Sequence, residues 1–355
     1  MYLWFKCQKS FSMGIDQKKW LLLGISQSHF CSKRAFDTRT INIRLQKRSI
    51  RTVVCRWRNC KMAVEEDLKA TFQEIEELTE EGFFGDKAKN LELLRKTMDG
   101  KEYLYKGLDE WLNDRKPKNK NIVAGYMIVF LQLYIDAIKT NNQESFDVIG
   151  SVFIGTSNYP QLECTSAFYE YIRIHTETLQ LFSKAKQYKR TTLAQKKKLA
   201  SALTNEYAKG IEVFSKILSR LVALLDIING KPYDILSLSN KLLDTKITMF
   251  LNLSNGKYDS LVNKIDRDLR NAESHLDIYY NSLKKTFLIK KTNREITIED
   301  MMEKIFPVIG QLFQAFLFSA IIIFTFFNRT DKERLCSIIE RIVELEKNYT
   351  RDGSK

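Results

Sequence analysis

Three residues able to take part in acid–base and phosphate chemistry stand close together in the sequence RNAESH, residues 270–275. Histidine changes its protonation state near neutral pH, so His275 could give or take a proton. The guanidinium of Arg270 could neutralise charge on a phosphate group, and the amide of Asn271 could hold an imidazole or an oxygen atom by a hydrogen bond. These residue types raise the question of a nucleic-acid-cleaving site.

The same residues also fit an ordinary helix surface. Asp266 lies four residues before Arg270 and Glu273 lies three after it, so Arg270 could form a surface ion pair worth a few tenths of a kcal/mol. His275 could be a boundary residue of an amphipathic helix with no chemical task. Spacing along the chain does not separate these two interpretations.

A helix over residues 258–281 is predicted to carry the motif. Apolar residues recur along it at spacings of three and four, which is typical of one buried helical face. At about 100° per residue, Asn271 and His275 lie one turn apart at one edge of that face, so Asn271 could orient His275 directly. Arg270 points about 140° away from His275, so it must reach round the helix or act from another protomer.

The elements around the motif are predicted to be mainly helical, because the chain has only 14 Gly and 4 Pro among 355 residues. A hairpin (286–290 and 295–298) interrupts the second half, and Thr297 with Asp300 predicts a cap for the helix that follows. The expected helices cover 63–81, 87–113, 122–140, 162–187, 204–228, 233–252, 298–327 and 331–347. We therefore expect an all-α fold, organised as a basic leader (1–61), a helical N-terminal region (62–200) and a helical bundle (201–350).

Arg270, Asn271 and His275, in this order and spacing, resemble the signature of HEPN domains, in which an arginine is followed by a polar residue and, after four to six positions, by a histidine. The order of elements over 204–350 is also similar to a HEPN helical bundle, including the hairpin. The resemblance implies a homodimeric endoribonuclease that cleaves RNA without a metal or cofactor, in a toxin or antiviral-defence role. An antitoxin or a sensor protein is an expected partner, and Glu273 is an auxiliary candidate for the site.

The residue types fit that reaction. Metal-independent cleavage needs the ribose 2′-hydroxyl to attack the adjacent phosphate, while one group removes its proton and another protonates the leaving 5′-oxygen. One histidine per protomer supplies one such group, so a two-fold pairing of the motif helices would bring two copies of Arg270, Asn271 and His275 together. The expected product ends in a 2′,3′-cyclic phosphate. The alternative is a catalytically inactive HEPN-like module that binds RNA or protein.

Residues 1–61 differ in composition from the rest of the chain. They carry 14 Lys and Arg residues against 2 acidic ones, so nearly all of the net charge of +14 lies there. This leader could be an organelle transit peptide, a disordered basic arm, or sequence upstream of a true start at Met62. It holds four of the six cysteines, and their spacing from His29 is unlike that of a compact zinc finger. The cysteine pattern indicates cytosolic usage rather than a disulfide framework.

One segment is long and apolar enough to cross a bilayer, residues 307–327. It contains Gln311 and Gln314, and the mean hydropathy of the chain is −0.30, so a buried core helix is favoured over a membrane span. We therefore expect a cytoplasmic protein, and the alternative is a membrane-anchored helical one. His175 is expected on a helix surface, and the lysines of 184–198 in a solvated turn that could guide RNA.

Overall fold

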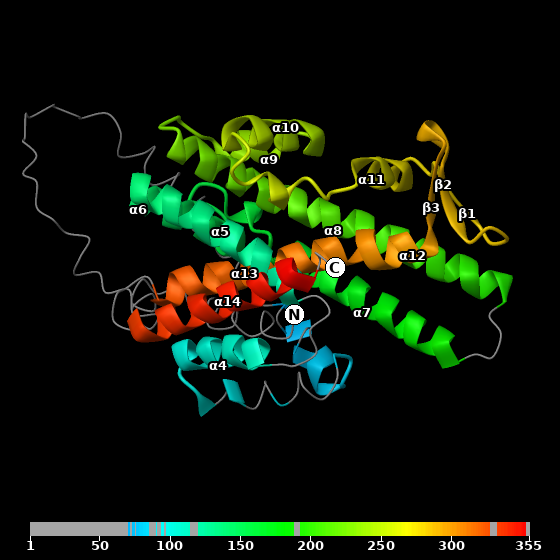
Figure 1. Cartoon of the computed structure of the whole chain (residues 1–355), viewed down its shortest axis with the longest axis horizontal. Coiled ribbons are helices and arrows are strands. Elements are labelled where there is room, and N and C mark those ends of the chain that lie inside the picture. The colour runs from blue at the N-terminus through cyan, green and yellow to red at the C-terminus, as the bar shows by residue number, and fades with distance from the viewer. Residues whose placement is uncertain are drawn as a thin grey trace, which may run out of the picture.

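The computed structural model describes residues 70–352, apart from 72, 75, 85–89, 91–93, 96, 114–119, 188–191 and 327–331. These residues form a bundle of long helices with a small antiparallel sheet at one end (Figure 1). The prediction of a mostly helical protein is therefore confirmed. The HEPN-like assignment of the bundle stays a prediction.

Helices and strands of the described residues have the following bounds. The helices are α4 (Gly100–Asn113), α5 (Lys120–Thr140), α6 (Asn142–Ile154), α7 (Thr165–Gln187), α8 (Leu193–Ile228), α9 (Ile235–Ser239), α10 (Leu243–Ser254), α11 (Arg267–Ser274), α12 (Ile298–Asp300), α13 (Phe306–Phe326) and α14 (Lys332–Asp352). The strands are β1 (Ile278–Asn281), β2 (Thr286–Ile289) and β3 (Arg294–Thr297). The helices predicted over 122–140, 162–187, 204–228, 298–327 and 331–347 are confirmed, with shifted ends.

α8 is the element around which most of the others pack. It starts with a capping box, in which Thr192 Oγ1 accepts a hydrogen bond from Gln195 N at 3.2 Å and Gln195 Oε1 accepts one from Thr192 N at 2.7 Å. Over its 36 residues it contacts α5, α6, α7, α9, α10, α11 and α13. The boundary expected between 62–200 and 201–350 falls inside α8, and one hydrophobic core includes residues of both regions. Their assignment as separate domains stays a prediction.

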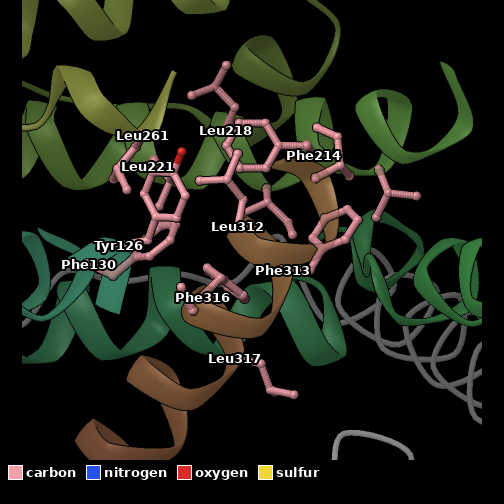
Figure 2. Packing of buried hydrophobic residues seen from close by; sticks show 14 of the residues in the cluster. Tyr126, Phe130, Phe214, Leu218, Leu221, Leu261, Leu312, Phe313, Phe316 and Leu317 are labelled. Atoms are coloured by element: carbon pink, nitrogen blue, oxygen red, sulfur yellow. The ribbon is translucent and has the colours of Figure 1, made fainter. Parts of the chain in front are cut away.

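The centre of the core lies where α13 packs against α5 and α8 (Figure 2). The ring of Phe316 meets Phe130 of α5 edge-on with 5.7 Å between ring centroids, and Phe313 lies 6.4 Å from Phe214 of α8. The sequence of α13 is apolar nearly all round, and α4 and α14 also pack against this helix. Burial of these large aromatic side chains makes α13 a principal source of the stability of the bundle.

Among the described residues, two helices are long and apolar enough to cross a membrane, Lys120–Thr140 and Ile298–Thr325, so the expectation of a single such segment at 307–327 is wrong. Within the fold, 56% of the first apolar window and 89% of the second are buried. Core helices of soluble proteins meet the same criterion of length and composition, so these helices are weak evidence for a membrane. The cytoplasmic location stays a prediction.

The segment between α8 and α13 differs most from its predicted structure. The helix predicted over 233–252 is divided into α9 and α10, and the helix predicted over 258–281 is wrong, because a 3-10 turn (Asp259–Leu261), α11 and β1 replace it. The predicted hairpin is confirmed as β2 and β3, and β1 adds an unpredicted third strand beside β2. The predicted cap is also confirmed, because Thr297 Oγ1 accepts a hydrogen bond from Asp300 N at 3.0 Å.

Two basic side chains lie close together in the core without a carboxylate. Arg220 donates to the Ser239 hydroxyl at 3.3 Å and to the Leu162 carbonyl, and Lys246 donates to the Ser215 and Ser239 carbonyls at 3.1 Å each. Neither cation forms an ion pair with another described residue. Burial, reinforced by the charge of Arg220, lowers the pKa of Lys246 to about 8.

This pKa predicts that stability increases as the pH rises above about 8. Between the folded pKa and the ordinary value of 10.5, the unfolded chain binds a proton at Lys246 that the folded chain does not, so a rise in pH favours folding. The free energy of unfolding, measured with urea, should rise between pH 7.5 and pH 9.5. This rise should be on the order of 1–2 kcal/mol larger in the original protein than in Lys246→Met. Burial raises the pKa of the Cys164 thiol, so this group lowers stability as the pH rises. Cys164 is present in both the original protein and Lys246→Met, so its effect cancels in the comparison. The same pH dependence in Lys246→Met would contradict the prediction.

Candidate functional site

α11 carries the RNAESH motif, and its first turn is anchored by three contacts. Asp266 caps the helix, because its side chain accepts a hydrogen bond from Leu269 N at 3.0 Å. The same carboxylate pairs with Arg294 of β3 at 2.7 Å, and Asp266 N donates to the Tyr207 hydroxyl of α8 at 2.7 Å. Leu269 and Ala272 are buried on the side of α11 that contacts α8. The motif is thus held by both α8 and the sheet.

α11 ends within the motif, so His275 is a helix cap rather than a helical residue. Leu276 N donates to Glu273 O at 3.2 Å and Asp277 N donates to Ala272 O at 2.7 Å, which are the two bonds of a Schellman motif. Leu276 adopts the left-handed conformation with φ of 56°, where a residue with a Cβ atom costs about 1 kcal/mol. Its side chain is 83% exposed, so the apolar stripe predicted to continue through it stops here.

Arg270 and Asn271 contact each other, and His275 stands apart from them. Arg270 Nη1 donates to Asn271 Oδ1 at 3.2 Å, and both side chains are half-buried. The imidazole of His275 is exposed and makes no hydrogen bond to another described residue, and its link to Asn271 is a backbone bond of 3.1 Å. Asn271 therefore orients Arg270 and not His275, contrary to the geometry expected from a continuous helix. Glu273 is half-buried on the same short helix.

A groove of about 1100 Å³ runs along one side of α11. We name it the α11–α13 groove, because α11, β3, the short π-helix Met301–Ile305 and the first turns of α13 line it. The apolar residues in its lining are Ile122, Ile265, Ile296, Ile305 and Val308, and of these Ile265, Ile296 and Val308 are buried. Of the four predicted site residues, Asn271 alone lines the groove.

Carboxylates outnumber basic groups around this groove. The acidic residues that line it are Asp244, Asp266, Asp268, Glu295, Asp300 and Glu303, and the basic ones are Lys264, Arg267, Arg294 and Lys304. Arg294 pairs with Asp266 and Lys304 with Asp300, each at 2.7 Å, and the hydrogen bond from Lys304 lowers the pKa of Asp300. Asp268 and Glu303 form no close ion pair with another described residue. The groove is therefore unfavourable for a phosphodiester backbone.

The sheet next to α11 is basic. Its exposed lysines, which we name the hairpin lysines, are Lys284, Lys285, Lys290 and Lys291. Lys290 N donates to Asp277 O at 2.9 Å, and the turn that contains Lys290 contacts α11. Tyr279 of β1 is 50% exposed. Exposed lysines and an exposed aromatic ring on the same small sheet are features that single-stranded nucleic acids can bind.

His175 was expected on a helix surface, and that prediction is wrong. Its Nδ1 pairs with Glu206 Oε1, and the Glu206 side chain is buried. The imidazole lies between the rings of Tyr171 and Phe306, with 6.0 Å between centroids on each side. These contacts join α7, α8 and the start of α13, so His175 has a packing role in the bundle.

No group of three or more His, Cys, Asp or Glu side chains that could hold a metal ion occurs among the described residues. His29 and the four leader cysteines lie outside that part of the chain. Cys164 is buried and Cys336 is exposed, and both are free thiols.

Of the lysines predicted to guide RNA, Lys184 lies near the end of α7, and Lys196, Lys197 and Lys198 lie in the first turns of α8.

Sequence reasoning missed Gln311 as a candidate binding residue. It is only 7% exposed and lines the α11–α13 groove, and its side-chain amide makes no hydrogen bond to any described residue. The sequence of α13 contains two amides, Gln311 and Gln314, so the sequence alone did not single out Gln311.

No family model, no curated protein and no solved structure matched this chain. An assignment of function therefore rests on the residues and the geometry described above.

Proposed function

We propose that the protein is a HEPN-type endoribonuclease that cleaves RNA through attack of the 2′-hydroxyl on the adjacent phosphate. The observation that carries the proposal is the presentation of Arg270, Asn271 and His275 at the end of one anchored helix. Arg270 is already positioned by Asn271 at 3.2 Å, and His275 is open to solvent. The hairpin lysines next to α11 supply positive charge for an RNA backbone.

In this reaction each side chain has a separate task. The Arg270 guanidinium neutralises the negative charge that develops on the phosphorane, because it can donate two parallel hydrogen bonds to phosphate oxygens. His275 either removes the proton of the 2′-hydroxyl or protonates the 5′-oxygen as it leaves. Bond formation by the 2′-oxygen and loss of the 5′-oxygen leave a 2′,3′-cyclic phosphate and a free 5′-hydroxyl. Glu273 is an auxiliary candidate, and no metal or cofactor takes part.

A homodimer would complete the site. One chain presents a single histidine at the motif, whereas the reaction needs one group to accept a proton and another to donate one. A two-fold pairing of α11 with its copy would place two copies of Arg270, Asn271 and His275 in one cleft. RNA would enter along the hairpin lysines, because the carboxylates of the α11–α13 groove oppose it on that side.

RNA cleavage by the purified full chain in the presence of EDTA tests this function. His275→Ala and Arg270→Ala should each reduce the rate at least about 100-fold, because general acid–base catalysis contributes about that much or more. His29→Ala is the matched histidine control and should cleave at the original rate. Products should carry 2′,3′-cyclic phosphate ends. Equal cleavage by all of these chains would show that the motif is not catalytic.

One observation favours a second candidate, a catalytically inactive module that binds RNA or protein. The imidazole of His275 has no hydrogen bond to a described residue to fix its orientation, and a catalytic histidine is usually oriented by a neighbouring group. This module would retain RNA with intact ends, and loss of the hairpin lysines would weaken binding while His275→Ala would not. The toxin or antiviral role, the antitoxin or sensor partner and the cytoplasmic location belong to the first proposal and have no structural support of their own.

A further inference from the structure

The two most exposed large apolar side chains of the described residues lie near the two ends of β1. Leu276, two residues before the strand, is 83% exposed, and Leu283, in the turn between β1 and β2, is 94% exposed. The ring of Tyr279 lies between them on β1 and is half exposed. β1 is an edge strand of the sheet, and the sheet lies at one end of the molecule (Figure 1). These three side chains are therefore open to a partner.

Hydrogen bonds fix the backbone at both leucines. Asn281 Oδ1 accepts hydrogen bonds from Leu283 N at 3.0 Å and from Lys284 N at 3.2 Å, which holds the turn between β1 and β2. The Schellman motif holds Leu276 in the left-handed conformation, where glycine is the usual residue. A leucine at this position is disfavoured by its Cβ atom and by its contact with water. A partner that takes the side chain out of water would offset the second of these costs.

Positive charge surrounds these apolar side chains. Residues 276–293 contain the four hairpin lysines and one acidic residue, Asp277. Lys284 pairs with Glu295 at 3.0 Å, whereas the other three lysines, like Asp277, form no ion pair with another described residue. All four lysines are exposed. We name Leu276, Tyr279, Leu283 and the hairpin lysines the β1 surface, which combines exposed apolar side chains with unpaired positive charge.

An anionic lipid bilayer matches both properties of the β1 surface. Exposed leucines can enter the headgroup region one by one, because a bilayer does not require a continuous apolar patch of fixed shape. Lysines can contact the lipid phosphates at the same time. RNA would pair with the lysines but would leave the leucines in water, because bases stack on aromatic rings. A protein partner usually buries a continuous apolar core, whereas Asp277 and Ser282 adjoin the two leucines in the chain.

We infer that the β1 surface docks onto an anionic bilayer. Leu276 and Leu283 enter the headgroup region, and because they lie near opposite ends of β1, the strand lies along the membrane surface. The ring of Tyr279 lies at the interface, and the hairpin lysines contact lipid phosphates. The helical bundle stays outside the membrane. In the proposed function the same lysines contact RNA, so a bilayer and RNA compete for them. The inference itself does not depend on RNA cleavage.

Flotation of the full chain with vesicles, in the absence of RNA, tests the apolar part of the β1 surface. On phosphatidylcholine vesicles with about one third phosphatidylserine, Leu276→Gly with Leu283→Ser should bind at least about 10-fold more weakly than the original chain. Leu276→Gly alone should weaken binding without lowering the thermal midpoint, because glycine fits the left-handed conformation. This pair of results separates loss of docking from loss of folding.

Leu242→Ser is the matched control. Leu242 is 77% exposed and lies at the start of α10, outside the sheet, so this variant should bind vesicles as the original chain does. The basic residues 1–61 are present in every one of these chains, so their attraction to the vesicles is common to all of them. Equal binding by the original chain and the double leucine variant would overturn the inference.

Charge and position are tested separately. Lys290→Glu with Lys291→Glu should weaken binding to the anionic vesicles, and the original chain should bind vesicles of phosphatidylcholine alone more weakly. In a mixture of anionic vesicles and RNA, a benzoylphenylalanine in place of Leu283 should crosslink to lipid, whereas one in place of Leu242 should not. Crosslinks from position 283 that reach RNA, a second copy of the chain or another protein, but no lipid, would overturn the inference.

Discussion

Arg220→Ala is expected to lower the free energy of unfolding by about 4 kcal/mol, as large a loss as a single substitution usually causes. The side chain is 2% exposed, and its hydrogen bonds connect α8 to the carbonyl of Leu162 and the hydroxyls of Ser151 and Ser239. Alanine would leave a cavity of nearly a whole arginine side chain. It would also leave buried acceptors without their donor, each at a cost of about 1–3 kcal/mol.

Urea unfolding of the full chain at pH 7 measures this loss, and Arg173→Ala is the matched control. Arg173 lies on the surface of α7 and pairs with Glu170 and Glu177, its neighbours on the same helix. Surface pairs of this kind contribute at most about 1 kcal/mol, so the control should unfold close to the original midpoint. A loss below about 1 kcal/mol for Arg220→Ala would mean that its buried hydrogen bonds do not stabilise the fold.

Gly210→Ala is expected to destabilise the protein by about 1–3 kcal/mol, although alanine is the better helix former. A Cβ atom at this position of α8 would lie 2.7 Å from Ile309 Cγ2 and 2.8 Å from Tyr171 Cε2. Both neighbours are buried side chains of other helices, so they cannot move away without disturbing the core. The loss of close packing therefore outweighs the gain of about 1 kcal/mol in helix propensity.

Gly125→Ala in α5 is the control for this prediction. The nearest atom that its Cβ would meet is Glu346 Cγ at 3.9 Å, which is ordinary van der Waals contact. Thermal unfolding should show an unchanged or higher midpoint for Gly125→Ala and a lower one for Gly210→Ala. If both substitutions raise the midpoint, α7, α8 and α13 do not approach as closely as the structure indicates.

The long helices could be predicted from sequence because each repeats its apolar residues over many turns. α8 and α13 are examples, since an error at one position does not alter a pattern that continues for more than 20 residues. The hairpin was also predictable, and so was the Thr297 cap, because each depends on residues close together in the chain.

The length of the motif helix could not be predicted in the same way, because one residue, Asp266, determines where it starts and another, Leu276, determines where it ends. Asp266 starts α11 through contacts with Tyr207 and Arg294, which come from distant parts of the chain. Leu276 ends it in a conformation that sequence statistics assign to glycine. The α11–α13 groove was equally hidden, since its lining extends from Ile122 to Gln311. Of the predicted residues, Arg270 and Asn271 contact each other, whereas the exposed imidazole of His275 stands apart, and this arrangement could be known only from the fold.

The hydrogen bond from Asp266 N to the Tyr207 hydroxyl couples the docking of α11, which carries the motif, to the packing of α8 in the core. Tyr207 is buried in α8, and α8 packs against α5, α7, α10 and further helices of the described residues. Release of α11 would break this bond, separate Asp266 from Arg294, and expose Leu269 and Ala272 in a single event. The motif helix should therefore behave as a two-position element, docked or undocked, without a continuous range of partly open geometries.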